Sequence, residues 1–361
     1  MPESITEIDP RRAGRSPTIH DVAATAGVSS ATVSRFLNGG RVRQADAIQQ
    51  AIDELGFRPS ALARSLKSGS TRAIGVVVPD ITNPFFAAVV KGIESVTRND
   101  EYDLYLCNTD ESVEREHRVV ASLVDKRVDG LLMAPATEHA EPPSYLLATG
   151  VPTVFIDRHL ADGGFDSVLV DNEGGAAQAV AHLTSLGHER IAMISGPLET
   201  TPGRGRYEGF VEAMRVAGLE TRPEHAVISD FRTTGGYQSM MRLLAVRPQP
   251  TAVFVANNLM AMGALRAIHD LGLRIPDAIS FISFDGLDLN ELLDPPLTFI
   301  DRPMEEQGVL AMRLLLSRIE HHDMGPARTI RLETRLKLGA SCAPPASPAS
   351  PPARGVRGTA G

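Results

Sequence analysis

Cysteine and tryptophan are scarce in this sequence. Its 361 residues include two cysteines, Cys107 and Cys342, and no tryptophan. The two cysteines lie far apart, and no histidine or further cysteine clusters near either of them. This pattern argues against a disulfide framework and against a zinc site. We therefore expect a fold that depends on its apolar core, with no metal and no other cofactor.

Long apolar runs are also missing. No stretch of about 18 apolar residues occurs, so no transmembrane helix is expected. The first residues, MPESITEIDPRRAGRSP, are polar and contain no apolar segment that could act as a signal peptide. With 43% hydrophobic and 22% charged residues, the composition is that of a globular protein of two or three domains. We expect a cytoplasmic protein with no membrane partner.

The charge is unevenly distributed along the chain. A net charge of −8 by itself argues against a nucleic-acid partner. From Arg11 to Arg72, however, ten basic and four acidic residues give a net charge of +6, which leaves −14 for the remainder. A basic segment on an acidic body is what attraction to DNA phosphates requires. A chance asymmetry would look the same, so charge alone leaves DNA binding open.

Two short helices joined by a tight turn are predicted near the N-terminus. Thr18 and Asp21 are spaced as a capping box, and Gly27 can adopt the positive φ of a turn at little steric cost. Ser29 can cap the second helix, whose inner face includes Val33. These features predict a helix-turn-helix, and the segment AIQQAIDELGF would add a third helix to its core. An ordinary helical hairpin with a polar surface is the alternative.

The outer face of the second helix carries short side chains and one guanidinium. Such a face can approach base edges in the DNA major groove. Arg35 is the expected direct reader, because its fork matches the O6 and N7 acceptors of guanine. Ser30 and Ala31 stand where discrimination between sites would be set. The DNA-contacting residues predicted here are Thr18, Ser29, Ser30, Ala31, Thr32, Ser34, Arg35 and Asn38.

The segment RPSALARSLKSGST follows the third helix. Pro59 ends that helix, and small or apolar residues then share one side of a helix of about eight residues, which is unstable alone in water. Two such helices could form together in the DNA minor groove, with Leu66 wedged into a base step. Ala63 and Lys67 join Leu66 as predicted DNA contacts. A flexible linker is the alternative.

From Ala73 onward, apolar runs alternate with helix-like segments. Their continuous Val, Ile and Leu content favours strands covered on both faces, and hence parallel sheets flanked by helices. Ten strands are too many for one doubly wound sheet, so we expect two similar α/β lobes, with SVLVDNEGG as a crossover. The runs are AIGVVVP, YDLYLCN, DGLLMA, VPTVFID, SVLVD, RIAMISG, AVISD, AVFVAN, ISFISFD and LTFI.

Ligands of parallel sheets bind at the carboxyl ends of the strands. The residues near these ends include carboxylates, amides, arginines and aromatic rings, which suit a polar, hydroxyl-rich small molecule. A polar group that only satisfies the backbone is the alternative for any one of them. The predicted effector-binding residues are Asn83, Phe85, Phe86, Asp157, Arg158, Arg206, Phe231, Asn257, Asp285 and, from the comparison below, Arg302.

Five segments closely resemble the LacI/GalR family of bacterial transcriptional regulators, from about Thr18 to Gly339. They are TIHDVAATAGVSSATVSRFLNG, ARSLKSGSTRAIGVVVPDITNPFF, VDGLLMAP, LGHERIAMISGP and NELLDPPLTFI. The resemblance implies an α/β fold class: an all-α helix-turn-helix headpiece and hinge helix, then a two-lobed periplasmic-binding-protein-like domain with Rossmann-like parallel sheets. In that comparison Ser30 and Ala31 match the pair that sets operator preference. Arg35 matches the base-reading arginine, and Leu66 the minor-groove wedge.

The resemblance also implies partners and a function. They are a homodimer, a pseudo-palindromic double-stranded DNA operator and a small-molecule effector: a sugar, sugar acid or sugar phosphate. The expected function is a repressor of carbohydrate or sugar-acid metabolism genes. No catalytic motif appears, so no enzyme is expected. The alternative from another class is a solute-binding protein without a DNA role, against which the basic segment and the missing signal peptide count.

Three departures from the family pattern stand out. The chain is about three residues shorter between Asn38 and Glu54, where Arg41 and Arg43 could replace lost phosphate contacts. Asn257-Asn258 replaces the usual Asn-Asp. Arg302 replaces the usual Gln after LTFI. Together with Arg158 and Arg206, the last two changes predict a positively charged cleft and an effector with a carboxylate or phosphate.

Purines are a rival effector class. The segment GPLETTPGRGRYEGF resembles purine-responsive members of the family. Thr200, however, stands where those members have a purine-contacting arginine, which places purines second.

The expected domain boundaries follow from these readings. Residues 1–16 would be disordered, 17–58 the headpiece, 59–72 the hinge and 73–340 the effector-binding and dimerisation domain. The lobes would be 73–172 with 303–327, and 173–302 with 328–340. Residues 341–361, rich in Pro, Ala, Ser and Gly, would be a disordered tail. The tail lacks leucine heptads, so nothing in it supports a tetramer.

Overall fold

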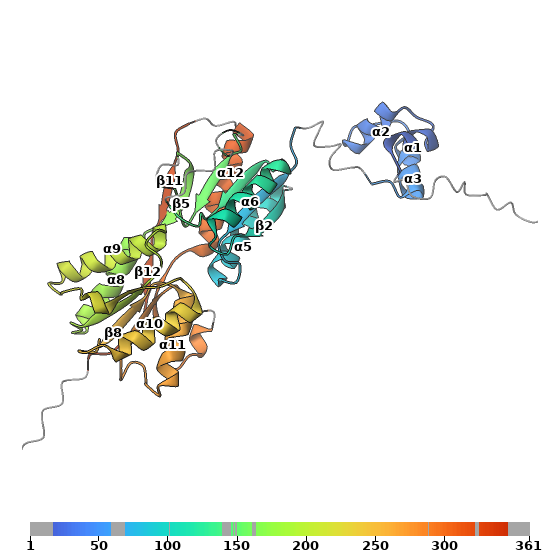
Figure 1. Cartoon of the computed structure of the whole chain (residues 1–361). Helices are drawn as coiled ribbons and strands as arrows, with labels where there is room; N and C mark the ends of the chain where they lie inside the picture. Colours follow the sequence, from blue (N-terminus) through green and yellow to red (C-terminus); the bar gives the residue numbers. More distant parts are fainter. Residues whose placement is uncertain are drawn as a thin grey trace, which may run out of the picture. The chain divides into compact units, whose positions relative to one another are not determined.

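The computed structural model divides the chain into two compact units, Met1–Thr71 and Arg72–Gly361 (Figure 1). It describes residues 17–58, 69–100, 102–138, 146, 148, 150–160, 164–287, 289–321 and 325–345. The predicted hinge contacts Ala63, Leu66 and Lys67 lie outside the described residues, as do the predicted disordered residues 1–16.

The first unit contains the three predicted helices, α1 (Ile19–Thr25), α2 (Ser30–Leu37) and α3 (Ala45–Leu55). We call residues 17–58 the headpiece. The backbone N–H of Thr18 donates to the Asp21 carboxylate at 2.8 Å, and Gly27 has a φ of +65° in the turn. The amide of Thr32 donates to the hydroxyl of Ser29 at 3.1 Å, so Ser29 caps α2. The three helices share a small core of Val22, Ala23, Val33, Ile48, Ala51 and Phe57.

The second unit contains two lobes, each built on a six-stranded sheet. The sheet of the first lobe is fully parallel, in the order β11-β5-β4-β3-β1-β2. Its elements are β1 (Ala73–Val78), α5 (Pro84–Asp100), β2 (Asp103–Asn108), α6 (Val113–Asp125), β3 (Gly130–Met133), β4 (Thr153–Ile156), β5 (Asp166–Val170), α12 (Met304–His321) and β11 (Thr329–Leu332).

The second lobe repeats this strand order as β12-β10-β9-β8-β6-β7, with β12 antiparallel to β10. Its elements are α8 (Asn172–Ser185), β6 (Ile191–Ser195), α9 (Thr201–Val216), β7 (Ala226–Ile228), α10 (Thr233–Ala245), β8 (Ala252–Val255), α11 (Asn258–Asp270), β9 (Ser280–Phe284), β10 (Thr298–Asp301) and β12 (Arg335–Lys337), with short 3-10 turns at Pro223–His225 and Asn290–Leu292. The ten predicted strands are β1 to β10, so the two-lobed architecture is confirmed.

Helices cover both lobes (Figure 1). In the first lobe α5 and α12 cross closely, because Gly92 and Gly308 have no side chain at the contact. A Cβ at Gly92 would overlap the carbonyl of Glu305. In the second lobe α8 packs on α9 and α10 packs on α11. This packing buries β1, β3, β4, β5, β6, β8 and β9 along their whole length.

The chain crosses between the lobes three times. The crossings are β5 to α8, β10 to α12, and β11 to β12. The expected assignment of 328–340 to the second lobe is therefore wrong for β11, which pairs with β5 in the first lobe. The sequence gives no sign of this crossing, because β11 and β12 are only 4 and 3 residues long.

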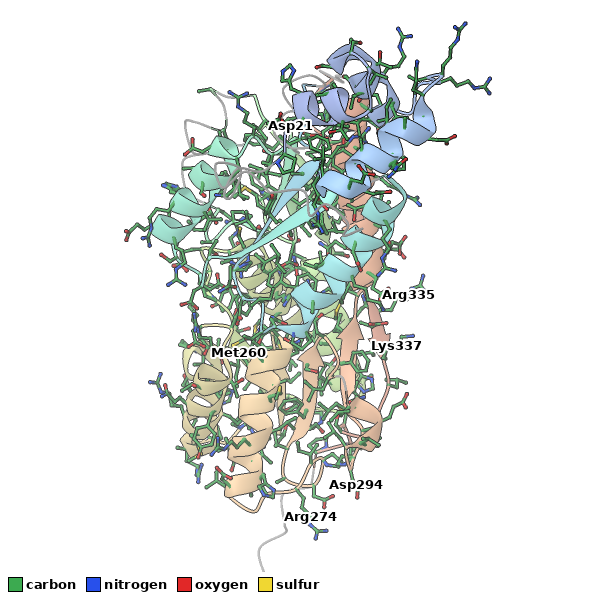
Figure 2. The ribbon with its side chains drawn as sticks, turned by 90° about the vertical axis from the view of Figure 1, so that its right-hand side faces the viewer. Asp21, Met260, Arg274, Asp294, Arg335 and Lys337 are labelled. Carbon is green, nitrogen blue, oxygen red and sulfur yellow. The ribbon has the colours of Figure 1, made fainter. Side chains whose placement is uncertain are left out.

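Strands β2 and β7 lie at sheet edges and differ from the prediction. Coverage of both faces was expected, yet Tyr105 and Leu106 of β2 are 46% and 40% exposed, and Ile228 of β7 is 53% exposed. The edge strand β12, in contrast, points Arg335 and Lys337 into solvent (Figure 2). Charged residues protect an edge from pairing with another chain, whereas apolar residues leave it open to a partner.

The predicted tail begins too early. Ser341 is fully buried, and its hydroxyl donates to the carbonyl of Phe281 at 2.6 Å. The carbonyl of Ala343 lies 2.9 Å from Nε2 of the buried His188. Residues 341–343 are therefore wrongly assigned to the disordered tail, because polar contacts with β9 hold a segment whose composition suggested disorder.

Candidate functional site

Seven of the eight headpiece residues predicted to contact DNA lie between the N-cap Ser29 and the C-cap Asn38 of α2, and the eighth, Thr18, is the N-cap of α1. Ala31, Arg35 and Asn38 are exposed, as is Ser29 at the N-cap. Thr18, Ser30, Thr32 and Ser34 are half-buried. The exposed guanidinium has no carboxylate within ion-pair distance among the described residues, and it is therefore available to a base or a phosphate.

The turn after α2 constrains Arg35. The amide of Gly40 donates to the Arg35 carbonyl at 2.9 Å. A Cβ at Gly40 would lie 2.5 Å from Cγ of Arg35, so a side chain there would displace the stem of the guanidinium. Arg41 and Arg43 are both exposed, which the suggested phosphate contacts would require.

Sequence reasoning missed one partner on this face. Nδ1 of His20, on α1, lies 3.0 Å from the hydroxyl of Ser30. An imidazole nitrogen can donate or accept, so His20 influences which role the Ser30 hydroxyl has left for DNA. The pattern of α1 gives no hint of this contact, which depends on how the two helices cross.

The second predicted site is a cleft between the two lobes of the second unit. It is lined by charged, amide and aromatic side chains from both lobes. Nine of the ten predicted effector residues line it: Asn83, Phe85, Phe86, Asp157, Arg158, Arg206, Phe231, Asn257 and Arg302. The tenth, Asp285, is fully buried behind Arg302. Lining residues that the sequence did not suggest are Asp80, Glu111, Pro202, Asp230, Arg232 and Leu259.

Three residues near strand ends at this cleft have a left-handed backbone. The φ angles are +65° at Asp157, +62° at Phe231 and +68° at Asp285. Non-glycine residues in this region cost free energy and concentrate at functional sites. Gly196 lies against the Phe231 ring, where a Cβ would overlap the ring atoms. The left-handed backbone therefore orients these side chains, at a cost in local strain.

Arg302 connects the lobes through two carboxylates. Its Nε and Nη2 donate to the two oxygens of Asp285 at 2.7 and 2.8 Å, and its Nη1 donates to Asp157 at 2.5 Å. The guanidinium also lies over the Phe85 ring, 3.5 Å from its centroid. Burial opposes its charge, but the two carboxylates outweigh burial and raise the pKa of Arg302.

Arg158 is also paired inside the protein. Its Nη1 and Nη2 donate to the Glu111 carboxylate at 2.7 and 2.8 Å, and Nη1 also donates to the Pro135 carbonyl. Burial opposes the charge, yet Glu111 outweighs it and raises the pKa of Arg158. Nε of Arg158 is buried and has no hydrogen-bond partner in the described part of the chain.

Arg206, on α9, differs from the other two. Nε donates to Oδ1 of Asn172 at 2.9 Å and Nη1 to the Ala256 carbonyl at 2.5 Å, with no direct carboxylate contact among the described residues. Nη2 is buried without a partner there, and the guanidinium lies 3.6 Å from the Phe284 centroid. Burial, together with the nearby charge of Arg302, lowers the pKa of Arg206 to about 9.

The expected positive charge of the cleft is offset. Four arginines line it, and so do four carboxylates, Asp80, Glu111, Asp157 and Asp230. The fourth arginine, Arg232, pairs with Asp110 of the first lobe at 2.9 Å. The prediction included only Asp157 of these four carboxylates and left out Asp80, Glu111 and Asp230, which lie in the loops after β1, β2 and β7.

The Asn257-Asn258 pair serves the structure. Asn257 accepts from the Met260 amide at the start of α11 and donates to the Phe231 carbonyl at 3.0 Å. Asn258 donates to Oδ1 of Asn83 in the other lobe at 3.1 Å. The amide at 258 therefore supplies a donor to Asn83 that a carboxylate could not supply.

A buried acid lies behind the cleft. Oε2 of Glu116 accepts the amide of Ala136 at 2.7 Å, and Glu116 is almost fully buried. Burial raises its pKa to about 7, and the Ala136 amide and Arg158 only partly oppose this shift. The next residues, Thr137 and Glu138, contact Glu199 of the second lobe, so Glu116 supports a loop that meets the opposite lobe.

The described residues include neither a membrane-spanning helix nor a metal-binding cluster. None of the helices there is long and apolar enough to cross a bilayer. Groups of three or more His, Cys, Asp or Glu placed to hold a metal ion are also absent from that part of the chain.

Comparison with known proteins identifies the type of both domains. Residues 18–60 match the model of bacterial regulatory proteins of the lacI family, and residues 180–342 match a periplasmic binding protein-like domain. A ribose operon repressor of Escherichia coli (strain K12) is 40% identical over 307 residues, 84% of this chain and 93% of that protein. The HTH-type transcriptional repressor PurR of Pasteurella multocida (strain Pm70) is 37% identical over 333 residues, 89% of this chain and 99% of that protein.

A solved structure supports the same assignment. The lac repressor dimer bound to operator and the anti-inducer ONPF is 26% identical, with a TM-score of 0.80. The match covers 91% of this chain and all of that chain. With a helix-turn-helix headpiece, a two-lobed cleft and relatives that are transcriptional repressors, the chain belongs to the LacI family of DNA-binding bacterial regulators.

Proposed function

We propose that this protein is an operator-binding repressor whose effector is a small neutral sugar of the pentose class, such as ribose. The observation that carries the effector class is the balance of charge in the cleft, where four arginines face four carboxylates. A neutral polyol can donate to carboxylates and accept from guanidinium groups without leaving a buried charge unpaired. Similarity to a ribose operon repressor supports the same class.

The aromatic rings favour a sugar as well. Phe85, Phe86 and Phe231 line the cleft, and a sugar ring presents C–H groups to such faces while its hydroxyls reach the polar groups. The buried donors without partners in the described residues, Nη2 of Arg206 and Nε of Arg158, would receive acceptors from hydroxyl oxygens.

A sugar acid is the second candidate, and Arg206 is the observation that favours it. Among the described residues, Arg206 is the one buried cleft arginine without a direct carboxylate contact. An anionic ligand would pair with it. A purine is disfavoured, because the Thr200 hydroxyl already accepts from the Gly203 amide and donates to the Pro197 carbonyl as the cap of α9.

Binding to a two-fold operator requires two headpieces, and we propose a homodimer. The apolar side chains left exposed at two sheet edges, Tyr105, Leu106 and Ile228, are suited to a second copy. The lac repressor similar to this chain is a dimer on its operator. Sedimentation of the wild type and of Leu106→Asp tests this proposal, with a shift toward monomer expected in the variant.

Titration calorimetry on the full-length protein separates the effector classes. D-ribose, D-ribonate, ribose 5-phosphate and hypoxanthine are compared at one ionic strength. We expect D-ribose or a closely related neutral pentose to bind, with Arg206→Met reducing affinity at least about tenfold, since a buried charged hydrogen bond contributes about 1.5–3 kcal/mol. If only ribonate binds, the effector is a sugar acid and the neutral-sugar proposal is wrong. If only hypoxanthine binds, the effector is a purine and both sugar proposals are wrong.

A further inference from the structure

Arg302 occupies the part of the cleft where the two lobes meet. It lies on the crossing between β10 of the second lobe and α12 of the first. Its side chain is 3% exposed, and the partner carboxylates of Asp157 and Asp285 are 4% and 1% exposed. Asp157 directly follows β4 of the first lobe and Asp285 directly follows β9 of the second, so one guanidinium joins both lobes.

These contacts use the groups that a sugar would otherwise bind. Asp285 accepts from Arg302 with both oxygens and is fully buried behind it. Asp157 accepts with one oxygen. The guanidinium also covers the face of Phe85, 3.5 Å from the ring centroid. A planar group with several donors that stacks on an aromatic ring and pairs with carboxylates has the interactions of a ligand.

We propose that Arg302 acts as a tethered internal ligand that holds the two lobes closed when no effector is bound. Because Arg302 pairs with Asp157 of the first lobe and with Asp285 of the second, the lobes cannot separate without breaking one of these two ion pairs. An effector then enters a cleft that is already closed and competes with Arg302 for Asp157 and the Phe85 face. We call Arg302 with Asp157 and Asp285 the clamp. Because the clamp lies in the proposed effector cleft, this inference rests on the proposed function.

A backbone contact between the lobes offers a direct measure of closure. The amide of Glu138, after β3, donates to the carbonyl of Glu199, after β6, at 2.8 Å. This hydrogen bond exists only while the lobes are together. Hydrogen–deuterium exchange of the peptide containing Glu138, in the full-length protein without any sugar, therefore reports the closed state.

Four proteins are compared: wild type, R302Q, D157N/R302Q and R232Q. We expect the Glu138 amide to be protected in the wild type and to exchange at least roughly tenfold faster in R302Q, since a buried pair is lost. R232Q is the matched control. It also removes an arginine that joins the lobes, but its pair with Asp110 is about half exposed on both sides, so less than about a fivefold change is expected. Unchanged exchange in the amides of β1 and β8 verifies the fold.

The double variant D157N/R302Q distinguishes two reasons for an open cleft, the loss of the clamp and the repulsion between the two carboxylates. R302Q leaves two buried carboxylates near each other, and their repulsion could open the cleft by itself. D157N/R302Q removes that repulsion without restoring a clamp, so it should remain fast in exchange. Slow exchange in the double variant, slow exchange in R302Q, or unprotected Glu138 in the wild type would each overturn the proposal.

A separate arm with D-ribose tests the proposed effector. In R302Q, a sugar that binds both lobes should restore protection of Glu138. Failure of this arm, with the sugar-free results as expected, would contradict D-ribose as the effector and leave the clamp supported.

Discussion

The headpiece and the cleft differ in how deeply their predicted binding side chains are buried and in how far apart in sequence the interacting residues are. In the headpiece, the side chains assigned to DNA are exposed or half-buried, and the contacts that shape their helix lie within a few residues in sequence. In the cleft, the charged groups are buried and pair over long sequence distances. Arg158 and Glu111 are 47 residues apart, and Arg302 and Asp157 are 145 apart.

This difference determines what a substitution changes. An exposed side chain contributes little to folding, so its replacement should alter binding and leave stability near wild type. A buried ion pair contributes to folding and binding together, because loss of one partner leaves a charge without compensation. The cleft should therefore couple effector binding to stability, while the headpiece face should not.

The largest expected effect on stability is in the cleft. Arg158→Met should lower the free energy of unfolding by about 2–4 kcal/mol, somewhat below the range for fully buried pairs because the Glu111 side chain is 26% exposed. Urea unfolding measures the change. The double variant Arg158→Met/Glu111→Leu should recover much of it. No recovery would mean that packing, and not the unpaired carboxylate, causes the loss.

Glu116 should make stability depend on pH in a defined direction. Its pKa is raised from 4.5 to about 7, so the folded protein holds a proton that the unfolded chain releases. The resulting stabilisation is fully present below pH 4.5 and is lost as the pH rises through about 7. Relative to wild type, Glu116→Gln should thus gain stability between pH 5 and 8, by about 2–3 kcal/mol.

Thermal unfolding at half-unit pH steps tests this effect. The Gln side chain can still accept the Ala136 amide, so the comparison isolates ionisation. A constant difference between the two proteins across this range would show that Glu116 does not titrate there.

Arg35→Ala should weaken operator binding by about 1–3 kcal/mol per half-site and relax base preference at one position, since a bidentate contact with guanine is lost. Fluorescence anisotropy with a symmetric site selected from random DNA measures affinity. The melting temperature should stay within about 1 °C of wild type, because surface changes away from special features are nearly neutral. A large loss of stability would contradict the division between headpiece and cleft.

His20→Phe should have the smallest effect. It keeps a ring on α1 and removes the nitrogen that faces Ser30, so about 1 kcal/mol in base preference is expected at the position read near the start of α2. Repeating the selection from random DNA measures it, with substitution of the exposed Thr25 by alanine as a control on α1. An unchanged selected sequence would show that His20 does not position Ser30.

The helix caps, the turn and the main strands depend on local periodicity and could be predicted from the sequence. Capping by Thr18 and Ser29, the turn at Gly27 and the ten main strands follow from spacing along the chain, and the structure confirms them. Parallel-sheet topology then explains why nine residues chosen from separate segments line one cleft.

Long-range partners could not be predicted in the same way. The number of arginines alone suggested a positively charged cleft. Nothing near Arg158 in the sequence indicates that it pairs with Glu111. Nor does the sequence indicate that Arg302 pairs with two aspartates on different lobes. Strand β11 was missed because its pairing with β5 joins segments more than 150 residues apart, across two lobe crossings. Burial at Ser341 depends on contacts with β9 that composition does not encode.

The most direct test of the account is operator affinity of the full-length protein measured with D-ribose and, separately, with D-ribonate. If a charge-balanced cleft controls the headpiece, saturating D-ribose should change the operator dissociation constant at least about fivefold, the lower end of ordinary allosteric coupling, and ribonate should not. A response to ribonate with none to D-ribose would contradict the central claim.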